Sequence, residues 1–352
     1  MPDPEFQPGQ PIEDYIIGQR LERGGMGELY LARDVTLKRK VIIKVLSAPF
    51  SQKQEYKNQF LKEAKIQANL DNPHVVQVFR AFVHQGVPCL VMQHVEGTDL
   101  EKIVKKATAV REKRQEKGAL SAERGIHIFL QVLEGIGFAH KYNIVHGDIK
   151  PSNILLDQQG RVKIVDFGLS FMLASGRKMK GESLPGGTLQ FMSPEQLLNE
   201  DVDSRSDIYS LGVTFFFMLT GQWPTGERKR LTDLLEYHLE GSLEGPARML
   251  EEVGTLRPRI RAAVLKALEK EQARRFQSCL EFSLAIKEDA PHELYSELLR
   301  LSLLASKEIT PAERNYLDRI AKMKGLQPGE AEALERSIRR EMGLLRPAPS
   351  AD

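Results

Sequence analysis

The chain has 352 residues, of which 41% are hydrophobic and 28% charged, a balance typical of a folded globular protein that excludes a fibrous or largely disordered one. The 50 Lys and Arg residues against 48 Asp and Glu residues leave a formal net charge of +2, so no overall field favours nucleic acid or an anionic membrane as a partner. We therefore expect neither nucleic-acid binding nor membrane association.

Cysteine usage and the first residues favour a cytoplasmic protein. The two cysteines, Cys89 and Cys279, each lie within an apolar stretch and outside any CxxC or metal-ligand pattern, so we expect two buried thiols. The acidic, proline-rich start of the chain lacks the basic-then-apolar order of a secretory signal. The longest apolar run, residues 211–219, is far shorter than the roughly 20 residues that a membrane helix needs. We predict no membrane span.

The first part of the chain has the pattern of a sheet that carries one helix. Residues 1–11 are expected to form a flexible N-terminus, with ordered structure from Ile12. Apolar residues then recur in short runs broken by glycines, which predicts antiparallel strands. The expected elements are strands within 15–46, a helix over 52–70, and strands over 75–83 and 89–95.

The second part is predicted to be mainly helical. A charged stretch at 101–117 fits a solvated helix face, with a docking surface as the alternative. Ser121 is a candidate N-cap for the helix that follows. Two short strands are expected on either side of a turn at 159–160, and further helices over 194–287.

A change of composition near residue 289 predicts a separate C-terminal appendage. Thr310-Pro311-Ala312-Glu313 is a capping box with proline at the first helical position, and a second helix start is expected at 327–330. About three helices over 289–345 would form a small bundle, followed by a disordered tail at 346–352. Two roles stay open for this bundle: a packing extension of the main domain, or a module for partner docking or self-association.

The segment His146–Asn153, with the sequence HGDIKPSN, and the Asp-Phe-Gly triplet at 166–168 carry the strongest functional signal. Phosphoryl transfer needs a hydroxyl placed in line with the γ-phosphate, and charge neutralisation by a metal and lysine. Asp148 could accept the hydroxyl proton, and Lys150 could reach the same phosphate. Asn153 and Asp166 offer the oxygen ligands that Mg²⁺ prefers.

With these residues the chain resembles the eukaryotic-like protein kinases, and is most similar to their bacterial serine/threonine branch. The resemblance covers about residues 12–288. It implies a bilobal α+β fold with an N-lobe of antiparallel sheet plus one helix (about 12–95), a mainly helical C-lobe (about 96–288) and the small helical bundle appended. It also implies ATP and Mg²⁺ as cofactors, with Mn²⁺ as a substitute, and protein substrates phosphorylated on serine or threonine.

The resemblance assigns roles to the residues around the nucleotide. Lys44, held by Glu63, would position the α- and β-phosphates. The metal would be bound by Asn153 and Asp166, and Asp148 would be the catalytic base, with Lys150 stabilising the γ-phosphate. The nucleotide would contact Leu21, Gly24, Gly25 and Gly27 of the glycine-rich loop and Lys44. It would also contact the gatekeeper Met92, the hinge residues Gln93, His94 and Val95, and Asn153 of the catalytic loop.

Further matches concern the activation segment. Ser193-Pro194-Glu195 would close this segment, with Glu195 paired to Arg275, and Asp207 would buttress the catalytic loop. Serine/threonine specificity is implied by Lys150-Pro151 and by Thr188, which contacts the catalytic loop in that branch. Three serines of the segment are candidate phosphorylation sites: Ser170, Ser175 and Ser183.

Three residues depart from the family pattern. Glu22 stands where the glycine-rich loop has its first glycine, and Ile42 replaces the small alanine over adenine, so both changes are expected to weaken or alter nucleotide binding. Gly147 replaces the arginine that pairs with a phosphorylated activation loop. We therefore expect activity to depend little on such a phosphate.

Two alternatives to a protein kinase stay open. A pseudokinase scaffold would bind partners without turnover, and Glu22 and Ile42 favour it, whereas the intact catalytic positions oppose it. A small-molecule kinase would share some motifs but would lack the Ser-Pro-Glu closure and the helix that contains Asp207. Each motif is weak alone, and it is their joint order that favours the protein kinase.

Overall fold

The computed structural model divides into two compact units, Met1–Ile286 and Lys287–Asp352, and each is described by itself. The residues that the structure describes are 6–23, 27–167, 189–198, 200–226, 228, 230–287, 295–296, 298–300, 302–303, 307–323, 326–342 and 344.

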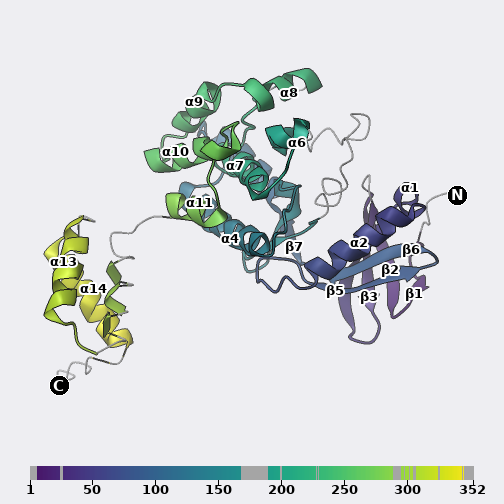
Figure 1. Cartoon of the computed structure of the whole chain (residues 1–352), viewed down its shortest axis with the longest axis horizontal. Helices are drawn as coiled ribbons and strands as arrows, with labels where there is room; N and C mark the ends of the chain where they lie inside the picture. Colours follow the sequence, from purple (N-terminus) through teal and green to yellow (C-terminus); the bar gives the residue numbers. More distant parts are fainter. Residues whose placement is uncertain are drawn as a thin grey trace. The chain divides into compact units, whose positions relative to one another are not determined.

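The first unit begins with a six-stranded sheet in the order β1-β2-β3-β4-β6-β5, in which all neighbours are antiparallel. The strands are β1 (Pro11–Ile12), β2 (Tyr15–Arg23), β3 (Gly27–Asp34), β4 (Arg39–Leu46), β5 (Val78–His84) and β6 (Val87–Gln93). The short helix α1 (Ala48–Ser51) and the longer α2 (Gln54–Gln67) follow β4, and α2 lies along β5 and β6 (Figure 1). The expected sheet with one main helix is present.

The alternation of side chains gives the sheet two different faces. One face buries Tyr30, Ile43 and Val91 in an apolar cluster. On the other face, the register pairs Leu29 with Lys44 and Ile42 with Met92. Directly paired residues point to the same side of a sheet, so these four side chains share the face that carries the lysine.

The packed region begins before the residue expected from the sequence. Phe6 is 5% exposed and belongs to the sheet core, and the backbone N–H of Gly9 donates to the carbonyl of Ile17. The expectation of a flexible segment up to residue 11 therefore does not describe residues 6–11. Their aromatic anchor is a single Phe in a polar stretch, which gives no periodic signal.

A second, small sheet joins the strands to the helices. It contains β7 (Gly97–Asp99), β8 (Ile154–Asp157) and β9 (Val162–Ile164), in that order. The backbone around Val76 bonds to Ile164, because the Val76 N–H donates to the Ile164 carbonyl at 2.9 Å and the Ile164 N–H donates to that of His74 at 2.8 Å. The strand-rich and helical parts are thus connected by backbone hydrogen bonds.

The helical part surrounds α7 (Ser204–Thr220), whose residues 206–220 are all buried. Around it lie α3 (Leu100–Lys113), α4 (Ala122–Lys141), α6 (Pro194–Leu198), α8 (Leu231–Glu240), α9 (Glu244–Glu252), α10 (Pro258–Ala267) and α11 (Cys279–Ile286) (Figure 1). The charged stretch is therefore mostly helix α3, and Ser121 caps α4 by accepting from the Arg124 N–H. Short 3₁₀ turns are η1 (Pro151–Asn153), η3 (Leu189–Phe191) and η4 (Gln272–Arg274).

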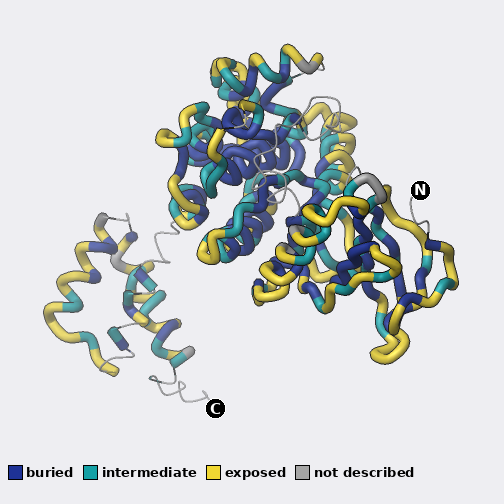
Figure 2. Tube along the Cα trace, turned by 45° about the vertical axis from the view of Figure 1, so that its right-hand side comes forward, coloured by how far each residue is buried: buried dark blue, intermediate teal, exposed yellow. Residues whose placement is uncertain are grey.

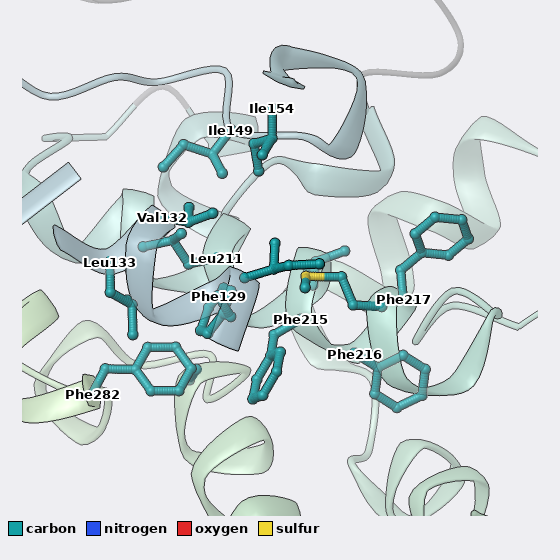
Figure 3. Close-up of a cluster of buried hydrophobic side chains, with 14 of the residues drawn as sticks. Phe129, Val132, Leu133, Ile149, Ile154, Leu211, Phe215, Phe216, Phe217 and Phe282 are labelled. Carbon is teal, nitrogen blue, oxygen red and sulfur yellow. The ribbon is translucent and has the colours of Figure 1, made fainter. Parts of the chain in front are cut away.

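Aromatic packing fixes α7 in place. The rings of Phe129 on α4 and Phe215 on α7 stack with centroids 4.1 Å apart, and Phe282 of α11 meets Phe129 edge-on at 5.2 Å (Figure 3). Figure 2 shows the buried trace through this region. Stacked and edge-on pairs add roughly 0.5–1.5 kcal/mol beyond area burial. The helix that contains Asp207 is thus packed through Phe215 against Phe129 of α4.

Both cysteines are free and buried, as expected. In the described part of the chain, no helix is long and apolar enough to cross a membrane.

The second unit has α13 (Pro311–Met323) and α14 (Pro328–Glu341), preceded by helical residues within 295–303. Both predicted helix starts form: Glu313 accepts from Thr310 while Thr310 accepts from the Glu313 N–H, and Glu330 accepts from the Gln327 N–H. Among its described residues, a cluster of seven buried apolar side chains forms a core: Tyr295, Leu299, Leu303, Leu317, Ala321, Leu326 and Ile338.

Candidate active site

The side chain of Asp207, which is 1% exposed, supports the backbone of the catalytic loop, residues 146–153. One carboxylate oxygen accepts from the backbone N–H of His146 at 2.8 Å, and the other accepts from that of Gly147 at 2.9 Å. The ring Nε2 of His140 lies 2.7 Å from the same carboxylate. Burial opposes the imidazolium, but the hydrogen bond to Asp207 raises the pKa of His140 to about 10. A charge-assisted pair therefore supports the loop.

Gly147 occupies a backbone conformation that other residues avoid, with φ at +74°. Its N–H is bonded to Asp207, and its carbonyl accepts from the Gln196 side chain at 2.8 Å. Gln196 is 3% exposed and also accepts from the Ser193 N–H at 2.9 Å. Because glycine has no Cβ, it adopts this φ without strain. Buried neutral and acidic groups fix the backbone at this position.

Three predicted residues meet around one carboxylate. Asp148 Oδ2 accepts from Lys150 Nζ at 2.8 Å and from Asn153 Nδ2 at 3.1 Å, and the same amide donates to the Asp148 carbonyl at 2.8 Å. Asp148 Oδ1 is inaccessible to solvent and has no hydrogen-bond partner within the described structure. An unpartnered buried acceptor is uncommon and needs an explanation. One acceptor oxygen of Asp148 is thus without a hydrogen-bond partner among the described residues.

The segment before the Asp-Phe-Gly triplet packs against the catalytic loop. His146 Nε2 lies 3.1 Å from the carbonyl of Val165, and the Phe167 ring lies 4.5 Å from the His146 ring. Asp166 between them has φ at +60°, a left-handed conformation that is unusual for a residue other than glycine. Such strain concentrates at functional sites.

Lys44 of β4 and Asp166 form an ion pair across the two parts of the first unit. Burial acts to raise the pKa of Asp166, but the charge of Lys44 holds it below its usual range, with smaller contributions from His146 and Lys150. The carboxylate therefore stays ionised at neutral pH. The structure thus brings Lys44, Asp148, Lys150, Asn153 and Asp166 together from β4, the catalytic loop and the triplet.

The other residues predicted to contact the nucleotide lie on the sheet, at its strand ends and in the segment that follows β6. Met92 is 5% exposed beside Ile42. Gln93 ends β6, its N–H donates to the Gln77 carbonyl, and His94 and Val95 follow it. Leu21 is 47% exposed near the end of β2, and Gly27 begins β3.

Two of the three departures from the family pattern, Glu22 and Ile42, lie on the lysine-bearing face of the sheet. Glu22 pairs with Leu29 across β2 and β3, and Leu29 pairs with Lys44, so the exposed glutamate points to the lysine side of the sheet. Ile42 packs partly buried beside Met92. The face therefore has an extra negative charge and extra bulk.

Some predicted residues lie outside the described structure. Gly24 and Gly25 fall within residues 24–26, and the side chain of Glu63 on α2 is not among those described. The same holds for Gly168, Thr188 and the three candidate phosphorylation serines: Ser170, Ser175 and Ser183.

Glu195 and Arg275 form the predicted pair. Two parallel contacts of 2.7 and 2.9 Å join the guanidinium to the carboxylate, and both side chains are almost fully buried. Burial alone would raise the pKa of Glu195, but the Arg275 guanidinium lowers it to about 2. Ser206 Oγ also donates to Glu195 at 2.6 Å, so this pair connects the end of the activation segment to α7.

Sequence reasoning missed two supporting residues, His140 and Gln196. Both make buried contacts with residues 49 to 67 positions away. The only signal in the sequence was a polar residue within an apolar helix and a polar residue next to the Ser-Pro-Glu triplet, and neither is specific.

The structure describes no group of three or more His, Cys, Asp or Glu side chains that could hold a metal ion by themselves. Asp166 and Asn153 supply two oxygen donors, and the Nδ2 contacts of Asn153 leave its carbonyl oxygen for a cation. Mg²⁺ is commonly bound by one or two protein groups together with substrate phosphates and water. These two donors therefore fit a metal ion whose other ligands are phosphate oxygens of a bound substrate and water.

Comparisons with known proteins show the family of the chain. The model of the protein kinase domain matches residues 15–280. Serine/threonine-protein kinase PknB of Mycolicibacterium smegmatis is 34% identical over 313 residues, which cover 85% of this chain and 47% of the relative. A probable serine/threonine-protein kinase of Clostridium perfringens, CPE1738, is 34% identical over 76% of this chain and 38% of its own length. This chain thus spans less than half the length of these curated relatives.

Solved structures agree on the fold. The crystal structure of the Mycobacterium tuberculosis PknI kinase domain, in a form with one cysteine changed to alanine, superposes with a TM-score of 0.61 at 24% identity, covering 81% of this chain and 99% of that one. The expected bilobal arrangement of an antiparallel sheet with a helical lobe is confirmed.

Proposed function

Because the chain belongs to the protein kinase family, whose model spans residues 15–280, we propose that it transfers the γ-phosphate of ATP to serine or threonine hydroxyls of proteins. The observation that carries the proposal is the unpartnered Oδ1 of Asp148. Its other oxygen is held by Lys150 and Asn153, so the free oxygen has a fixed position from which to accept a hydroxyl proton.

The remaining residues have distinct tasks in this proposal. Lys44 orients the α- and β-phosphates, and its charge keeps Asp166 ionised. Asp166 and Asn153 would hold Mg²⁺, which when bound with ATP neutralises charge on the phosphates. Lys150, next to Asp148, offsets charge on the transferred group. The remaining nucleotide contacts would come from the glycine-rich loop, the gatekeeper and the hinge: Leu21, Gly24, Gly25, Gly27, Met92, Gln93, His94 and Val95.

A phosphate-transfer assay tests this function. The chain is incubated with radiolabelled ATP, Mg²⁺ and a generic protein substrate such as casein, next to an Asp148→Asn variant. General-base positions contribute roughly 10²–10⁴-fold to rate, so incorporation should fall at least a hundredfold in the variant. Equal incorporation by both proteins would refute the role of Asp148.

A pseudokinase scaffold is the second candidate, and Glu22 and Ile42 on the lysine-bearing face favour it. An anionic side chain repels phosphate, and the larger Ile narrows the space for adenine. The transfer assay separates the two, because ATP binding without incorporation would identify a scaffold. A small-molecule kinase is opposed by the Glu195–Arg275 pair and by Asp207 on α7, and failure of every protein substrate with turnover of small alcohols would favour it.

We also infer that activity does not need a phosphorylated activation loop. Gly147 offers no guanidinium for a phosphate, and its backbone is instead held by Asp207 and Gln196, which are both buried and neither of which is cationic. Phosphatase treatment should leave turnover within about twofold of the untreated protein. Loss of turnover after such treatment would contradict the inference.

The second unit is proposed as a separate module for partner docking or self-association, with the catalytic part at about residues 12–288. It has its own buried core and its own capped helices. Sedimentation of the full chain and of a version ending at Lys287 tests this proposal. Loss of oligomers or of bound partners on truncation supports the module. The same oligomers and the same bound partners in both versions would refute it.

A further inference from the structure

Glu28 is a buried carboxylate that the proposed chemistry does not use. It is 5% exposed and lies on β3, one residue before Leu29. Since successive strand residues point to opposite faces, Glu28 points away from the lysine-bearing face and towards the sheet core that contains Tyr30. Acidic side chains are rarely this buried unless they are paired.

Three groups pair with this carboxylate. The Tyr30 hydroxyl donates to one oxygen, and Arg20 lies 3.6 Å from the same atom. Arg23 Nε lies 3.3 Å from the other oxygen. Arg23 is the last residue of β2 and is paired in register with Glu28 at the start of β3. The carboxylate therefore joins the two strand ends that lead into the glycine-rich loop.

The same network reaches the N-terminal segment. The Phe6 ring packs edge-on against Tyr30 with centroids 5.7 Å apart. Burial, reinforced by Glu28, raises the pKa of Tyr30 to about 12. Tyr30 therefore stays a hydroxyl donor at neutral pH, between Phe6 on one side and Glu28 on the other.

We propose that Glu28 is a positioning residue for the nucleotide, and that the N-terminal segment sets nucleotide affinity through Phe6 and Tyr30. This inference rests on the proposed function of the lysine-bearing face. Backbone N–H groups of a glycine-rich loop bind phosphates only when the flanking strands hold them in place. Loosening the strand ends adds conformational freedom that ATP must remove on binding.

The direction of the change in ATP affinity distinguishes a positioning role of Glu28 from an effect of its charge alone. Glu28→Gln keeps the size of the side chain and removes one negative charge. Long-range Coulomb interaction alone would then strengthen the binding of anionic ATP. We expect the opposite: ATP binds about five- to tenfold more weakly to the variant, with kcat within about twofold of the original chain.

The test measures the dissociation constant of a fluorescent ATP analogue and amide hydrogen exchange over residues 20–30 in the full chain. Glu28→Gln and Phe6→Ala should both weaken binding and speed exchange at the ends of β2 and β3. Glu13→Gln is the matched control, since Glu13 is an exposed carboxylate of the same lobe that pairs with Arg80 at 3.6 Å, and it should change neither. Tyr30→Phe, which keeps the ring in the core, gives the same test if Glu28→Gln folds poorly.

Each outcome decides the inference. Weaker binding with faster exchange supports it, even if the chain proves to transfer no phosphate, because binding is measured apart from turnover. Unchanged or tighter binding in Glu28→Gln overturns it and leaves the proposed kinase function standing. Absence of nucleotide binding by the unaltered chain overturns both.

Discussion

The catalytic loop and the nucleotide face of the sheet are built in different ways. Around the loop, the supporting side chains are buried and paired: Asp207 is bonded to two backbone N–H groups and to His140, and Gln196 bonds to Gly147. On the sheet face, Glu22 is exposed and Ile42 is only partly buried. The residues proposed for phosphate transfer are thus held by buried contacts, and two of the three departures from the family pattern lie where the nucleotide would bind.

This contrast indicates which property of the chain a substitution in each region should change. A buried network tolerates little change, because removing one partner leaves another unpaired away from water. An open face tolerates substitution at a small cost in stability. We therefore expect changes in the loop to affect folding and turnover, and changes on the face to affect ATP affinity.

Glu195→Gln should give the largest loss of stability. It leaves the Arg275 side chain, 0% exposed, without its anionic partner, and breaking a buried pair costs about 3–5 kcal/mol. Urea unfolding measures the loss. The double variant Glu195→Gln/Arg275→Met should lose less unfolding free energy than the sum of the two single variants. A loss below about 1 kcal/mol for Glu195→Gln would contradict the buried pair.

Asp207→Asn should combine a smaller loss of stability with a loss of turnover. The amide cannot accept as strongly from both loop N–H groups and His140, and hydrogen bonds to a charged group contribute about 1.5–3 kcal/mol. We expect kcat to fall at least tenfold while the dissociation constant of ATP changes little. A variant with weaker ATP binding and normal kcat would show that the loop and the sheet face are not separate in this way.

The His140–Asp207 pair predicts a dependence of stability on pH. The pKa of His140 is about 10 in the folded protein, above its usual 6.5, so the folded state binds this proton more tightly. The contribution is complete below about pH 6.5 and is lost as the pH rises through about 10. The difference in unfolding free energy between the original chain and His140→Gln should therefore shrink over that range, and a constant difference would argue against the charged pair.

Gly147→Ala tests the backbone of the loop by itself. A residue with a Cβ at φ of +74° costs roughly 1–2 kcal/mol. Gly160→Ala is the matched control, because Gly160 has φ of +76° on an exposed turn with open space around it. Thermal unfolding should show similar losses for both, while only Gly147→Ala lowers kcat. Normal turnover in Gly147→Ala would mean that the loop adapts.

Ile42→Ala and Glu22→Gly should have the smallest effects, and in the direction of gain. Each change removes bulk or negative charge from the lysine-bearing face, and ATP should bind about fivefold more tightly, or roughly 1 kcal/mol. Titration with a fluorescent ATP analogue measures this, with Ile16→Ala, at a 39% exposed position of β2, as the control. Unchanged affinity would remove the main argument for a weakened nucleotide site.

The sequence predicted best those parts whose residues lie close together in the chain. Asp148, Lys150 and Asn153 fall within six residues, so their proximity follows from one turn and the 3₁₀ helix η1. The strands and the capped helices of the second unit were recognisable because alternation and capping are local. That Lys44 and Asp166, 122 residues apart, belong to one site was implied only by the family resemblance. The resemblance paired Lys44 with Glu63, and the ion pair with Asp166 was not predicted.

The parts that could not be predicted depend on tertiary contacts. Phe6 is buried because the sheet offers it the Tyr30 ring, and nothing in the flanking polar residues indicates this. His140, Gln196 and Glu28 look like ordinary polar positions in the sequence, and only the fold shows that each is buried next to a specific partner. Buried polar contacts of this kind carry no periodic signal.

The burial of both thiols makes the chain well suited to site-directed labelling. Cys89 and Cys279 are the only cysteines in the sequence, and both are buried, while burial raises the pKa of Cys89 to about 12 and so suppresses its thiolate. A single cysteine introduced at an exposed position such as Lys38 or Gln159 would react selectively with a maleimide dye. Fluorophore pairs placed in this way could follow the movement of the sheet against the helices in solution without removing any native residue of the core.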